Sequence, residues 1–70
     1  MKLPLKRKKM YEKKEWLSPQ ELYMEFGFSL STQAKYRQRR EIPYSKVGKY
    51  IRYNRERINQ WLFANEKEVA

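Results

Sequence analysis

The sequence contains no cysteine, no histidine and no aspartate. A chain without cysteine forms no disulfide bonds and offers no thiolate ligands to a metal. The missing histidine and aspartate remove most of the groups used for general acid–base catalysis and metal binding. Glu21 and Glu25 lie one helical turn apart, which indicates an exposed helix face rather than a catalytic pair. The sequence therefore predicts a protein that is not an enzyme, with no metal, cofactor or small-molecule substrate.

Glycine and proline are also scarce, with two and three residues, and there is no long apolar run. No window is long enough to span a bilayer, and 1–9 lacks the apolar core of a signal peptide. No segment combines a wide apolar helix face with a lysine-rich one, so membrane binding is not expected. We expect one compact intracellular domain, located in the cytoplasm.

The charge is strongly positive, with 17 Lys or Arg against 8 acidic residues and a net charge of +9. The segments 1–15 and 16–62 each carry a net +5, and 63–70 carries −1. We interpret them as a flexible basic arm, a folded domain, and the end of the last helix with a frayed tail. Clustered cations gain affinity for nucleic acids by releasing condensed counterions. The positive charge of the folded domain therefore predicts a nucleic-acid partner even without the arm.

The basic arm has two interpretations. It lies along DNA phosphates or in a minor groove, or it is a solvated leader. If it binds DNA, the expected contacts are the consecutive basic residues Lys6, Arg7, Lys8 and Lys9.

Two helix starts follow the arm. Ser18-Pro19-Gln20-Glu21 has the pattern of a capping box with proline at the first helical position, so a helix begins at Pro19 and ends at Gly27. Ser29 and Ser31 both offer N-cap oxygens to a second, very basic helix. Pro43 forces the residue before it into extended geometry, and the second helix is expected to continue until that point.

A hairpin and a third helix complete the plan. The runs 44–47 and 50–53 are rich in aromatic and β-branched residues, and Gly48-Lys49 suits a two-residue turn. Asn54 is a good N-cap for a third helix, in which Trp61 is expected to be a packing anchor. The order of elements predicts a mainly α fold with a small two-stranded β wing, a winged helix-turn-helix.

These motifs together resemble the excisionase family of small DNA-binding domains, relatives of the MerR winged helix-turn-helix. The resemblance rests on four segments that cover about two thirds of the chain: 16–22, 27–32, 42–48, and 53–62. It implies a winged helix-turn-helix without catalytic activity that binds specific sites on double-stranded DNA. Family members commonly end the second helix with glycine, whereas this chain has Arg39-Arg40-Glu41, which predicts a longer helix.

The second helix is the expected recognition helix. At 100° per residue one arc of the helix is expected to meet the core, whereas the opposite arc, with Ser31, Lys35, Gln38 and Arg39, is free to enter a major groove. The core-facing arc consists of Leu30, Gln33, Tyr36, Arg37 and Arg40. The predicted DNA contacts of this helix are base-reading residues together with arginines that reach phosphates: Ser31, Thr32, Lys35, Arg37, Gln38, Arg39 and Arg40. The predicted contacts of the wing cluster around its tip: Lys46, Lys49, Tyr50 and Arg52.

The sequence thus predicts a sequence-specific reader of double-stranded DNA. The resemblance implies an excisionase-like factor of a mobile element that assists integrase-mediated excision, associated with the nucleoid of a prokaryote, phage or mobile element. Its expected partners are DNA, an integrase, and other copies of itself on DNA. A small transcriptional regulator of the same fold is the first alternative. RNA binding and a protein-interaction adaptor that docks through the region of Phe63 are alternatives of other classes.

Overall fold

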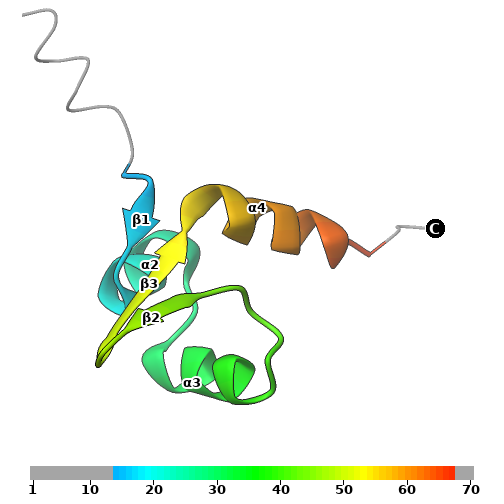
Figure 1. Ribbon diagram of the computed structural model, residues 1–70. Coiled ribbons are helices and arrows are strands. Elements are labelled where there is room, and N and C mark those ends of the chain that lie inside the picture. The colour runs from blue at the N-terminus through cyan, green and yellow to red at the C-terminus, as the bar shows by residue number, and fades with distance from the viewer. Residues whose placement is uncertain (1–13, 68–70) are drawn as a thin grey trace, which may run out of the picture.

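The computed structural model describes residues 14–67, which form three helices and a three-stranded antiparallel sheet (Figure 1). The predicted arm contacts Lys6, Arg7, Lys8 and Lys9 lie outside the described residues. No helix within 14–67 is long and apolar enough to cross a membrane. The elements in chain order are β1 (Trp16–Leu17), α2 (Pro19–Phe26), α3 (Leu30–Gln38), β2 (Ser45–Val47), β3 (Tyr50–Asn54) and α4 (Arg55–Ala64).

The sheet has one strand more than the sequence predicted. The strand order is β1-β3-β2, and β1 pairs with β3 through Trp16 opposite Asn54 and Leu17 opposite Tyr53. The predicted two-stranded wing, β2 and β3, is therefore part of a larger sheet, in which β1 pairs with the other edge of β3. A strand of two residues is too short to show an alternating pattern, and the helix cap at Ser18 follows it directly.

The predicted hairpin is confirmed. Val47 pairs with Tyr50 across a two-residue connection, and Gly48 has a φ of +62° at its first central position. A turn of this kind needs a positive φ at that position, which glycine adopts without steric penalty. In Figure 1 the turn of the β2–β3 hairpin lies at the left edge of the fold, on the side away from α4.

The start of α2 is also as predicted. The Ser18 Oγ accepts a hydrogen bond from the Glu21 amide at 3.2 Å, and the Glu21 carboxylate accepts one from the Ser18 amide at 2.9 Å. At the other end Gly27 adopts a left-handed conformation with φ +85° and its amide donates to the Tyr23 carbonyl. The capping box and the glycine stop together fix both ends of α2.

The end of α3 differs from the prediction, because the helix stops at Gln38 rather than continuing to Pro43. Arg40 has a φ of +59°, its amide donates to the Arg37 carbonyl, and the Glu41 amide donates to the Tyr36 carbonyl. This is the hydrogen-bond pattern of a Schellman motif, in which the left-handed residue is usually glycine. Here an arginine adopts that conformation, so residue type did not reveal the helix end.

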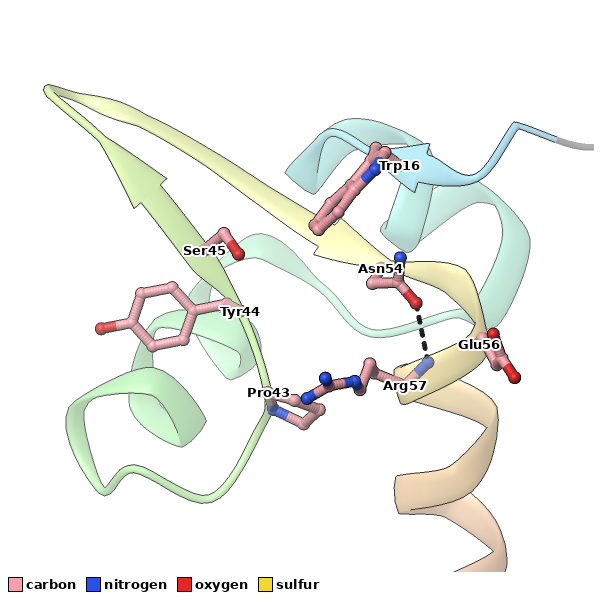
Figure 2. Close-up of a pocket in the computed structure, with 7 residues that line it drawn as sticks. All are labelled: Trp16, Pro43, Tyr44, Ser45, Asn54, Glu56 and Arg57. Atoms are coloured by element: carbon pink, nitrogen blue, oxygen red, sulfur yellow. Dashed lines mark hydrogen bonds between the residues drawn. The ribbon is translucent and has the colours of Figure 1, made fainter.

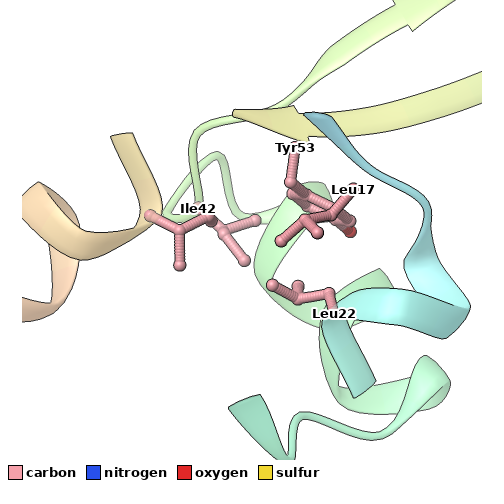
Figure 3. Packing of buried hydrophobic residues seen from close by; sticks show 5 residues of the cluster. Leu17, Leu22, Ile42 and Tyr53 are labelled. Atoms are coloured by element: carbon pink, nitrogen blue, oxygen red, sulfur yellow. The ribbon is translucent and has the colours of Figure 1, made fainter. Parts of the chain in front are cut away.

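The core lies between the sheet and the three helices and is small. Its buried apolar residues come from β1, α2, the loop before β2, β3 and α4 (Figure 3): Leu17, Leu22, Ile42, Tyr53 and Ile58. The rings of Phe28, Tyr36 and Trp61 pack beside this core, with the Trp61 centroid 5.7 Å from each of the other two. Trp61 is therefore the packing anchor of α4, as predicted.

The Schellman motif generates a prediction about stability. Replacing Arg40 by glycine removes the steric cost of a left-handed side-chain residue, and we expect Arg40→Gly to raise the free energy of unfolding by about 1 kcal/mol. Arg39→Gly is the matched control, because it removes the same charge at a right-handed position with φ −86°. We expect this control to lower the free energy of unfolding by roughly 0.5–1 kcal/mol. Urea denaturation measures both free energies of unfolding. Equal effects of the two substitutions would contradict the assignment of Arg40 as the left-handed residue of the Schellman motif.

The capping box generates a prediction about pH. A hydrogen bond from the Lys14 ammonium and one from the Ser18 amide lower the pKa of Glu21 from 4.5 to about 2. A lowered pKa stabilises the fold above pH 4.5, and this stabilisation is lost as the pH falls toward 2. In Glu21→Gln the amide still accepts from Ser18 but has no charge to lose. We expect its melting temperature to fall less steeply than that of the parent across this window, as measured by circular dichroism.

Candidate nucleic-acid interface

The basic exposed face of α3 is the centre of the candidate interface. Most of the residues predicted to read bases are exposed on it: Ser31, Lys35, Gln38 and Arg39. Thr32 is half-buried, and its hydroxyl accepts a hydrogen bond from the N-cap Ser29 at 2.9 Å. Thr32 therefore contributes to the cap as well as to the predicted phosphate site at the start of the helix.

Gln33 fixes the position of α3 against α2. Its side chain is fully buried, and its Nε2 donates to the carbonyls of Pro19 at 3.0 Å and Phe28 at 2.8 Å. One carbonyl belongs to the first turn of α2 and the other to the loop between the two helices. The Oε1 of this amide is buried without a hydrogen-bond partner. Gln33 thus connects the beginning of one helix, the loop and the first turns of the next through a single side chain.

Arg37 is half-buried, and its guanidinium is bound to residues of the protein itself. Its guanidinium donates to the Tyr53 hydroxyl and lies 5.9 Å from the centre of the Tyr44 ring. Burial raises the pKa of Tyr53, whereas this guanidinium acts in the opposite direction. Arg37 therefore joins α3 to β3 and the loop before β2. The sequence assigned it only to phosphate, although its position on the core-facing arc was a signal of this structural role.

The hairpin carries cations around an exposed tyrosine. The Lys49 ammonium and the Arg52 guanidinium lie 5.7 Å and 5.8 Å from the centre of the Tyr50 ring. Lys46 is paired with Ile51 and projects from the opposite face of the hairpin to Arg52. The four predicted wing residues are all exposed, but the register separates Lys46 from the cluster formed by the other three.

The remaining predicted arginine, Arg40, is exposed at the end of α3 in its left-handed conformation. It lies next to Arg39, which is also exposed, so two guanidinium groups extend the basic surface beyond the last turn of the helix. The structure therefore retains the predicted basic end of α3 although the helix itself is shorter. Both groups are free to reach a polyanion.

An ion pair that the sequence did not indicate connects the end of α2 with the start of α4. The Arg55 guanidinium contacts both carboxylate oxygens of Glu25, and its Nε donates to the Lys14 carbonyl at 2.7 Å. The Arg55 amide also donates to the Glu15 carbonyl, and the Glu25 carboxylate raises the pKa of Arg55. Arg55 is thus committed to the structure. Its partners are up to 41 residues away in sequence, so no local pattern revealed them.

A second feature missed by the sequence is an open groove beside β1. It has a volume of about 530 Å³ and is lined by Trp16, Arg57 and residues of the loop before β2. Figure 2 shows the Trp16 ring above this groove and the Arg57 side chain extending from α4 toward Pro43. The sequence indicates Trp16 only as the first residue of the domain, because a strand of two residues has no recognisable pattern.

Comparison with protein-family models, curated proteins and solved structures gives no match. Within 14–67 no cluster of three or more His, Cys, Asp or Glu side chains is placed to hold a metal ion. The interpretation of this interface therefore rests on its own charge, exposure and geometry.

Proposed function

We propose that this protein binds double-stranded DNA at specific sequences, as a winged helix-turn-helix with α3 as the recognition helix and the β2–β3 hairpin as the wing. The observation that carries this proposal is the arrangement of α3. Gln33 is fully buried against α2, and Lys35, Gln38 and Arg39 are exposed on the other side. A helix fixed by its inner face and bearing base-reading side chains on its outer face is suited to a major groove.

The hairpin supports the same proposal through its charge. Lys49 at the turn and Arg52 on β3 both lie against the Tyr50 ring at an exposed tip. Two strands fit the width of a groove, and ammonium and guanidinium groups bind its phosphates. The basic end of α3 at Arg39 and Arg40 adds phosphate contacts of the same sign.

For the biological role we propose an excisionase-like factor of a mobile element that assists an integrase. The resemblance of the four segments to the excisionase family supports this role. A small transcriptional regulator would use the same interface, and the DNA-binding step is common to both. The test is selection of random duplex DNA by the purified full chain at near-physiological salt, followed by sequencing. An enriched motif supports the proposal, whereas the absence of enrichment contradicts it.

The recognition helix generates a prediction about specificity. Each good side-chain pair with a base edge contributes about 1–3 kcal/mol of discrimination. We therefore expect Lys35→Ala or Arg39→Ala to bind the selected site roughly tenfold more weakly while binding to scrambled duplex changes less. Lys67→Ala is the matched control, since it removes one exposed positive charge outside α3 and the hairpin. If the variants prefer the selected site over the scrambled duplex as strongly as the parent does, an element other than α3 reads the bases.

The wing generates a prediction about salt dependence. Lys49 lies at the hairpin turn and is not predicted to read a base. Its ammonium is expected to act as a point charge on phosphate. We expect Lys49→Ala to weaken binding to all duplexes alike and to lower the slope of log K against log salt by about one. Fluorescence anisotropy at a series of salt concentrations measures this slope. An unchanged slope would show that the hairpin tip does not contact DNA.

A further inference from the structure

The outer face of the sheet, opposite the core, carries exposed aromatic rings. Side chains alternate along a strand, so the burial of Tyr53 toward the helices places Arg52 and Asn54 on the outer face. The register adds Trp16 beside Asn54, and Tyr50 lies on the same face two residues before Arg52. Trp16 is 45% exposed and Tyr50 is 57% exposed. Both rings are thus partly exposed on a face that the core does not use, and the Lys49 and Arg52 side chains lie over the Tyr50 ring.

The groove beside Trp16 adds a concave site to this face. Its volume of about 530 Å³ is within the range of about 300–1,000 Å³ that small-ligand sites occupy. The indole of Trp16 and the side chain of Arg57 lie on different sides of it, as Figure 2 shows. Ser45 contributes a hydroxyl to the lining. The groove therefore offers a stacking surface, a guanidinium and a neutral polar group within one ligand-sized space.

The charge of this face favours an anionic occupant. Arg57 lies in the groove, and Arg52 and Lys49 lie along the hairpin against Tyr50. Glu56, at the start of α4, is the acidic residue that lines the groove. Three cations against one carboxylate, interleaved with two exposed rings, match a ligand that carries both flat rings and negative charges.

We propose that the outer face of the sheet is a binding site for single-stranded nucleic acid, with one base stacked on Trp16 in the groove. A second base stacks on Tyr50 when the Lys49 and Arg52 side chains move from over its ring, and Arg57 and Arg52 bind the phosphates. Stacking on a side chain requires a base whose face is not covered by its neighbours, which unpaired strands provide and an intact duplex does not. This site uses Trp16 and Arg57, which have no part in the proposed duplex interface. Unpaired DNA and unpaired RNA share this chemistry.

The test measures binding of the full chain to fluorescein-labelled oligo(dT) and oligo(U) of about 12 nucleotides, a length within the known site sizes of single-strand binding folds. We expect saturable binding at near-physiological salt, and a roughly tenfold loss for Trp16→Ala with either or both oligonucleotides. Trp16→Phe retains a stacking ring and should stay close to the parent. Phe63→Ala is the matched control, because it removes a ring that is 73% exposed on α4 outside this face. Thermal melts verify that each variant folds.

The outcomes distinguish the outer face of the sheet from α3 as the site that binds single strands. Loss with Trp16→Ala and with Arg57→Ala, but not with Lys35→Ala, supports the inference, and the relative affinities for oligo(dT) and oligo(U) identify the preferred sugar. No saturable binding, equal binding by Trp16→Ala and the parent, or failure of Trp16→Phe to retain affinity overturns it. Duplex selection is a separate measurement, so the proposed function can fail while Trp16-dependent binding remains, and the reverse is equally observable.

Discussion

The structure depends on Tyr53, a residue of β3 whose ring and hydroxyl connect the sheet to the helices. Its backbone pairs with Leu17 of β1, its ring is fully buried beside Leu22, and its hydroxyl accepts a hydrogen bond from Arg37 of α3. A domain this small has few other long-range contacts, so one buried ring with a satisfied hydroxyl carries a large share of its cohesion. Because α3 is attached to the sheet through this contact, the position of the hairpin relative to α3 follows from it.

A second constraint fixes the angle at which α3 meets α2. Gln33 binds two backbone carbonyls, and the left-handed Gly27 makes the short turn between the helices possible. A glutamine in the core has a cost, because its Oε1 is buried without a hydrogen bond, a loss typically of about 1–3 kcal/mol. An apolar side chain would avoid that cost but would leave the Phe28 and Pro19 carbonyls without this donor. The amide therefore contributes precise orientation of α3 rather than net stability.

Local rules predicted the elements whose signals lie within a few residues. The Ser18–Glu21 capping box, the Gly27 stop and the Gly48 turn were all readable, because each is a direct hydrogen-bond or φ requirement of its own segment. The helix end at Arg40 was not, because the left-handed residue there is not glycine. Strand β1 and the Arg55–Glu25 pair were not readable either, since they are defined by partners more than 25 residues away in sequence.

The predictions for the candidate site divide in the same way, into local patterns that the sequence reveals and contacts between distant residues that it does not. The helical arc correctly separated the buried Gln33 from the exposed Lys35 and Arg39, because a period of 3.6 residues is a property of the helix alone. It was wrong at the two ends of the arc, since Leu30 is 49% exposed and Arg40 lies beyond the last turn of α3. The sequence could not distinguish an arginine that binds the protein from one that binds a ligand.

Arg37, Arg52 and Arg57 illustrate this ambiguity, because the sequence gives them the same charge and the fold gives them different neighbours. Arg37 is bonded to Tyr53, Arg52 lies against an exposed ring, and Arg57 lines a groove. A guanidinium that already donates to a buried hydroxyl has fewer donors left for phosphate. Arg52 donates to the Ile51 carbonyl at 2.7 Å and keeps its remaining donors for a ligand. The net charge of +9 therefore overstates the number of cations available to a partner. The proposed binding surfaces use arginines and lysines that the fold leaves exposed, among them Lys35 and Arg39 on the outer side of α3 and Arg57 in the groove beside β1.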